Sequence, residues 1–74
     1  MKDIYRVSIE QRLKELEFDK DNIDGVLVLL EGNFEWEKEM CTFLQNDKLT
    51  PHSRDAIFKY ARYISDNWYL ENID

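Results

Sequence analysis

The feature that most constrains this fold is a run of five apolar residues at positions 26–30. A helix through this run has no face that prefers water, so we expect it to lie at the centre of the molecule. Asp19 precedes the run as a helix N-cap, with Phe18 and Ile23 at the spacing of a hydrophobic staple. Gly32 follows it as a natural helix end. The sequence therefore predicts a buried central helix between Asp19 and Gly32.

Three further helices are predicted around it, over residues 3–17, 34–46 and 51–70. Apolar residues recur at helical spacing on one face of each: Tyr5, Ile9, Leu13 and Leu16; Trp36, Met40, Phe43 and Leu44; Ile57, Ala61, Ile64 and Trp68. A chain of 74 residues is near the lower limit for a core of its own, but its ten aromatic residues supply large buried surfaces. The predicted fold class is all-α, a compact bundle of about four short helices in a single domain over residues 1–74.

Polar residues mark the expected ends of these helices. Asn33 is suited to cap the helix that follows it, and Thr50 with Pro51 is suited to begin the last one. Two boundaries have alternatives. Ser8 offers a later start for the first helix, and residues 65–67 either continue the last helix or divide it in two.

A central β-hairpin at residues 26–38 is the alternative to two helices. Phe34 and Trp36 alternate with Glu35 and Glu37 as in a half-buried strand, which would make the fold α+β. The helices are favoured because Glu, Lys, Met and Gln dominate the following residues and are poor strand formers.

The charge of the chain is strongly asymmetric. The formal net charge is −6, and residues 15–39 hold nine acidic residues against two lysines. The negative electrostatic potential of these residues repels nucleic acid and favours a basic protein partner. The acidic residues expected to meet that partner are Glu31, Glu35, Glu37 and Glu39.

The last predicted helix is rich in aromatic residues, with five of the ten between positions 58 and 69. One helix can turn only part of its circumference to a core, so some of these rings are expected at the surface as anchors for a partner. The candidates are Tyr60, Tyr63, Trp68 and Tyr69. The cations Arg54, Lys59 and Arg62 lie beside them, but three are too few to favour direct nucleic-acid binding by so acidic a chain.

The sequence offers little for catalysis or for cofactors. His52, Ser53 and Cys41 are the only base and nucleophiles of note, and none stands in a recognisable motif. We expect neither an enzyme nor a bound cofactor or metal. The chain also shows no secretory signal and no apolar run near the ~20 residues that cross a bilayer, which predicts a cytoplasmic protein without membrane contact.

Residues 13–31 resemble a calcium-binding EF-hand. Counting back from Gly25, Asn22, Asp24 and Glu31 fall at ligand positions of the EF-hand loop, although the first ligand position holds Lys20. The resemblance implies a calcium-responsive protein. An N-cap role for Asp19 explains the same residue types without a metal.

A second resemblance is to ubiquitin-associated three-helix domains. It lies in residues 13–18, in the apolar helix and in residues 32–44. That family carries a glycine before the aromatic residue that follows its first helix, whereas this chain has Glu17 before Phe18. The resemblance implies three packed helices and no function.

Together these features predict a small, acidic, non-enzymatic protein-binding module. We expect an inhibitor or regulator that docks on a basic, nucleic-acid-handling protein, by analogy in size and charge with small proteins of phages and mobile elements. The alternatives are a homodimeric structural or regulatory protein paired through the aromatic helix and, third, the calcium-responsive protein.

Overall fold

A computed structural model describes residues 4–72, with side chains described as far as residue 67. These described residues form four α-helices and one 3-10 turn: α1 (Ile4–Glu15), α2 (Lys20–Leu30), α3 (Phe34–Leu44), η1 (Pro51–Ser53) and α4 (Arg54–Asn72). The predicted all-α bundle is confirmed. The alternative hairpin at residues 26–38 is wrong, because α2 and α3 cover those residues and no described residue lies in a strand.

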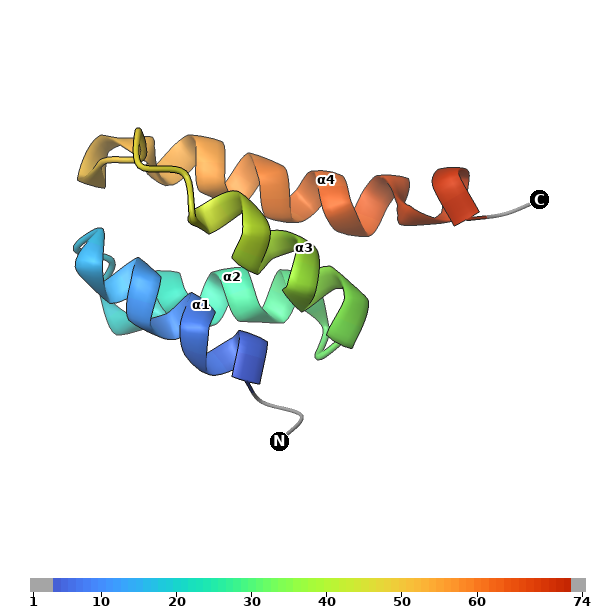
Figure 1. The fold of residues 1–74 in the computed structure, drawn as a ribbon, viewed down its shortest axis with the longest axis horizontal. Helices are drawn as coiled ribbons and strands as arrows, with labels where there is room; N and C mark the ends of the chain where they lie inside the picture. The colour runs from blue at the N-terminus through green and yellow to red at the C-terminus, as the bar shows by residue number, and fades with distance from the viewer. Residues whose placement is uncertain (1–3, 73–74) are drawn as a thin grey trace.

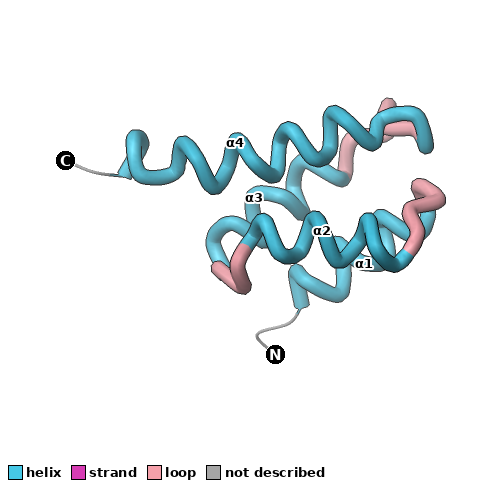
Figure 2. Tube along the Cα trace, turned by 180° about the vertical axis from the view of Figure 1, so that it is seen from behind, coloured by secondary structure: helices cyan, strands magenta, loops and turns pink. Residues whose placement is uncertain are grey.

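The helices pack in two pairs. Figure 1 shows α3 crossing between α1 and α4, and Figure 2 shows from behind that α2 lies between those same two helices. The main contacts join α1 to α3 and α2 to α4. The C-terminal end of α4 extends beyond the other three helices (Figure 1). No helix among the described residues has the length and apolar character needed to cross a membrane.

The core is built from the apolar lines that the sequence predicts. Fully buried residues come from all four helices: Ile9, Leu13, Val26, Leu30, Met40, Leu44, Ile57 and Ala61. One expectation is wrong. Val28, in the middle of the apolar run, is 72% exposed. Neighbouring helices cover α2 on only part of its circumference, and Val28 lies on the part that faces water.

The predicted caps are confirmed at three helix starts. The Asp19 carboxylate accepts a hydrogen bond from the Asn22 backbone N–H at 2.8 Å, and Asn33 accepts from Trp36 N–H at 3.1 Å. Thr50 forms a capping box at the start of η1. Each cap satisfies backbone donors that the helix leaves unpaired, and is worth about 1 kcal/mol.

Both boundaries with alternatives are resolved in favour of longer helices. Ser8 lies inside α1, so it does not begin the helix. Residues 65–67 lie inside a continuous α4. There the Ser65 hydroxyl donates to the Arg62 carbonyl and the Asn67 amide donates to the Tyr63 carbonyl, both at 3.0 Å. These polar side chains bond to the preceding turn rather than interrupting the helix.

Arg12 ties α1 to the end of α3. Its Nε donates to the Leu44 carbonyl at 2.7 Å and its Nη2 to the Asn46 carbonyl at 3.1 Å. The last carbonyls of a helix have no partner within it, so a cation at this end satisfies them and complements the helix dipole. The third bond of Arg12, to Glu15 at 3.1 Å, holds the guanidinium in place.

The turn between α1 and α2 places a non-glycine residue in a left-handed conformation. Glu17 has a φ of 66°, and the backbone N–H of the following Phe18 donates to the Leu13 carbonyl at 3.0 Å. This is the position and backbone shape that glycine usually supplies at a helix end. A side chain at such a φ costs about 1–2 kcal/mol.

We therefore expect Glu17→Gly to stabilise the protein by about 0.5–1 kcal/mol, since relief of the strain exceeds the entropic cost of glycine in the unfolded chain. The measurement is the free energy of unfolding from urea titration. Glu17→Ala is the matched control, because it removes the same charge and keeps the strain. A gain for alanine equal to that for glycine would show that the charge, not the backbone, is responsible.

Candidate functional site

The structure separates the four acidic residues expected to bind a partner. Glu35 and Glu39 are exposed and lie one turn apart on the outer face of α3. Glu31 is exposed at the C-cap of α2, in another part of the surface. Glu37 is only 5% exposed, so its expected role on the acidic surface is wrong. Residue 37 lies three positions before buried Met40 and shares its face of the helix.

Three aromatic rings form a row between α3 and α4. The rings of Phe43 and Tyr60 stack with centroids 4.1 Å apart and an angle of 13° between their planes. Tyr63 continues the row, 5.9 Å from Tyr60, and is 48% exposed. We call Phe43, Tyr60 and Tyr63 the aromatic seam. Tyr63 is thus exposed as the sequence predicts, and its role as an anchor for a partner stays a prediction.

Phe43 is the member of the seam that sequence reasoning missed as a surface residue. Its spacing from Met40 and Leu44 assigns it to the core line of its helix, yet it is only partly buried. Its ring packs against the edge of the core and stacks on Tyr60. The side chains of Trp68 and Tyr69, also predicted as anchors, lie outside the described residues.

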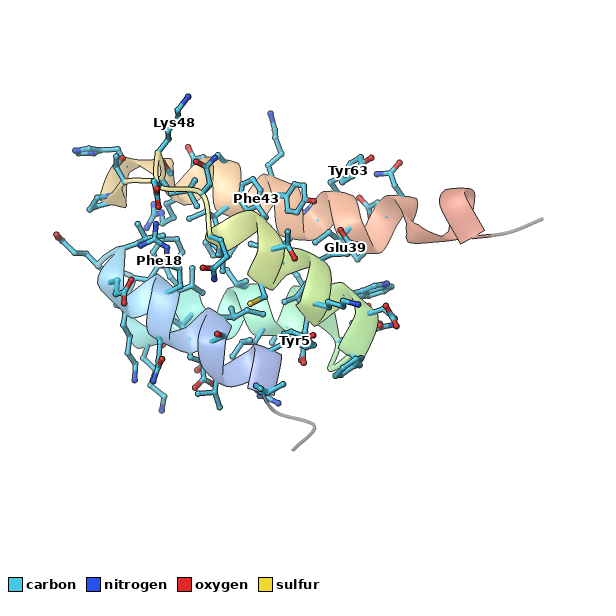
Figure 3. The ribbon with its side chains drawn as sticks, in the orientation of Figure 1. Tyr5, Phe18, Glu39, Phe43, Lys48 and Tyr63 are labelled. Carbon is cyan, nitrogen blue, oxygen red and sulfur yellow. The ribbon has the colours of Figure 1, made fainter. Side chains whose placement is uncertain are left out.

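The seam and the acidic residues of α3 lie together. In Figure 1, α3 and α4 run in opposite senses across the molecule. Glu39 lies one turn before Phe43 on α3, and Tyr63 lies one turn after Tyr60 on α4. Because the helices run in opposite directions, Glu39 and Tyr63 lie toward the same end of the Phe43–Tyr60 stack. Figure 3 shows Glu39 on α3 and Tyr63 on α4 at about the same level along the two helices. We call the two acidic residues and the seam, Glu35, Glu39, Phe43, Tyr60 and Tyr63, the α3–α4 surface.

The residues considered for catalysis do not form a constellation. His52 is exposed in η1, and Cys41 is partly buried on α3. The Ser53 hydroxyl accepts a hydrogen bond from the Thr50 backbone N–H at 3.0 Å, so it serves the capping box. Among residues 4–72, no three His, Cys, Asp or Glu side chains are placed to hold a metal ion.

The segment that resembles an EF-hand loop is helical. Residues 20–30 form α2, with Asp19 as its N-cap. In an EF-hand the corresponding residues form an open loop whose oxygen atoms converge on the ion. The local structure therefore follows the capping interpretation of Asp19.

Comparison of the chain with models of known protein families, with curated proteins and with solved structures found no match. The basis for a function is therefore the chemistry of the described surfaces.

The stacked pair at the seam predicts energetic coupling. We expect Phe43→Ala and Tyr60→Ala each to lower the free energy of unfolding, with a coupling of about 0.5–1.5 kcal/mol between them in a double-mutant cycle. Tyr63→Ala should change stability by less than about 1 kcal/mol, because half of its side chain already faces water. A large loss for Tyr63→Ala would mean that this ring is structural and not free to meet a partner.

Proposed function

We propose that this protein binds a basic partner protein through the α3–α4 surface. The observation that supports this proposal is the stack of Phe43 on Tyr60, which joins α3 to α4 at the surface. Exposed Glu39 lies one turn before Phe43, and half-exposed Tyr63 lies one turn after Tyr60. Half-exposed aromatic rings are the anchors on which protein interfaces depend most. Carboxylates beside them favour cationic partners and accelerate the encounter.

The net negative charge of the whole chain adds to the preference of the α3–α4 surface for cationic partners. With a net charge of −6, the molecule attracts basic surfaces over a distance of about 8 Å at physiological salt. Glu35 and Glu39 are one helical turn apart, so they present two negative charges to a single row of cations. A protein surface that holds nucleic acid is such a row, because Lys and Arg supply most phosphate contacts.

The proposed activity is therefore inhibition or regulation by occupancy. The α3–α4 surface would cover cations that otherwise contact phosphate groups, and no chemical step is needed. We place this activity in the cytoplasm, where the lone Cys41 thiol remains reduced.

The proposal is tested by capturing partners from native host lysate at low salt and then measuring the affinity of the purified partner. We expect Glu35→Gln with Glu39→Gln to weaken binding at least tenfold, because two charge contacts are lost. Tyr63→Ala should weaken it by a similar factor, since it removes the ring that anchors the contact. Binding of the unmodified chain should fall steeply as salt is raised.

The matched control is Glu17→Gln with Asp21→Asn, which removes two exposed charges from other parts of the molecule. This control should retain nearly full affinity. Equal losses in the control and in the α3 pair would show that net charge alone drives binding. A partner that is held equally well after Tyr63→Ala and the α3 substitutions would contradict the proposed surface.

A further inference from the structure

A basic groove lies on the opposite side of α4 from the aromatic seam. It runs between α2 and α4, has a volume of about 540 Å³, and is lined by Asn22, Arg54, Asp55, Phe58, Lys59 and Arg62. Three cations and one carboxylate give this lining a net charge of +2. Such a concentration of positive charge is unexpected in a chain whose net charge is −6.

Within the part of the chain whose side chains are described, no ion pair involves the cations of the basic groove. The ion pairs of the described chain join Arg6 to Glu10 and Arg12 to Glu15, both within α1. Arg54, Lys59 and Arg62 are exposed and take part in neither pair. Their charges are therefore available to an external group.

The residues of this lining are regularly spaced along α4. Arg54, Phe58 and Arg62 follow one another at intervals of four residues, so the two guanidinium groups flank one aromatic ring. The α-carbons of Arg54 and Arg62 are about 12 Å apart, eight residues at the rise of a helix. The groove thus presents a cationic group, an apolar surface and a second cationic group in a row.

The outer face of α2 carries a row with the same pattern and the opposite charge: an acidic residue, an apolar residue and a second acidic residue. Asp24, Val28 and Glu31 are all exposed and border one shallow depression. The two acids lie seven positions apart, about 10 Å along the helix, and between them is the most exposed large apolar side chain of the described residues. We call these three residues the acidic stripe. Arg6 also borders it, but its ion pair is with Glu10.

Two of these charges oppose local helix stability. Arg54 is the first residue of α4, where the helix dipole disfavours a cation. Glu31 is the C-cap of α2, where the dipole disfavours an anion, and its φ is 54°. Residues that break a local rule without a structural gain are expected where a surface has a function.

We propose that the basic groove of one copy of this chain receives the acidic stripe of a second copy. Asp24 and Glu31 then face Arg54 and Arg62, and Val28 covers the exposed part of Phe58. Because groove and stripe are different surfaces, the contact is head-to-tail, and the bound pair still offers one free groove on one copy and one free stripe on the other. The α3–α4 surface takes no part, so the contact is independent of the proposed partner binding.

The contact is small, and two chains of charge −6 repel each other, so we expect a dissociation constant on the order of 0.1–1 mM. Sedimentation equilibrium of the full chain tests this over about 0.05–2 mM, a range chosen to bracket that affinity. An ionic strength of about 0.15 M screens the net repulsion. The average mass should rise with concentration above that of one chain.

Reversing the charges of the groove or of the stripe then tests whether these two surfaces contact each other. Arg54→Glu with Arg62→Glu, and separately Asp24→Lys with Glu31→Lys, should each give a chain that remains monomeric. Mixing the two variants should restore association, because the unaltered stripe of one meets the unaltered groove of the other. Circular dichroism checks the fold, and Arg54→Gln with Arg62→Gln replaces the reversed pair if helix content falls.

Two controls distinguish this contact from a general effect of net charge and from pairing through the aromatic seam. Lys14→Glu with Lys48→Glu produces the same net charge as the groove variant and should associate like the unmodified chain. Tyr63→Ala should also associate normally, because the seam lies outside the contact. The proposal is overturned if the unmodified chain is monomeric throughout, if either reversed variant still associates, or if the mixture does not.

Discussion

The close approach of α2 and α4 at Gly25 is the constraint on which the surfaces of this molecule depend. A Cβ atom at Gly25 would lie 3.2 Å from Cε1 of Phe58, so a side chain at residue 25 would require the Phe58 ring to shift by a few tenths of an ångström. Phe58 in turn stacks with Phe18 at 6.2 Å, which joins α4 to the turn between α1 and α2. With α4 held there, Ile57 and Ala61 fill the core, and the helix is left with two usable sides.

These two sides have different chemistry because they meet different neighbours. Toward α3, the seam residue Tyr60 stacks on Phe43, and Glu39 lies one turn before Phe43 on the same face of that helix. Toward α2, Phe58 lies among the cations of the basic groove. One helix therefore separates a surface suited to basic partners from one suited to acidic partners, in a chain too small to provide two domains. The proposals of partner binding and of head-to-tail association rest on this separation.

Much of the fold could be predicted because its signals are local. Asp19, Asn33 and Thr50 each cap a helix through a hydrogen bond to a residue two or three positions away, so the sequence alone contains both partners. The exposure of Val28 and the burial of Glu37 could not be predicted in the same way. Both depend on how much of a helix its neighbours cover, and that is decided by packing between residues far apart in sequence. The position of Glu39 and Tyr63 toward the same end of the Phe43–Tyr60 stack likewise follows from the opposite directions of α3 and α4.

The central claim is that α4 docks at Gly25 and thereby creates both surfaces. Nuclear Overhauser effects between protons test it directly in the unmodified chain in solution. We expect strong effects from the Gly25 α-protons to the Phe58 ring and from the Phe43 ring to the Tyr60 ring. A spectrum in which α4 is helical but both sets of effects are absent would contradict the claim, because neither the aromatic seam nor the basic groove would then exist.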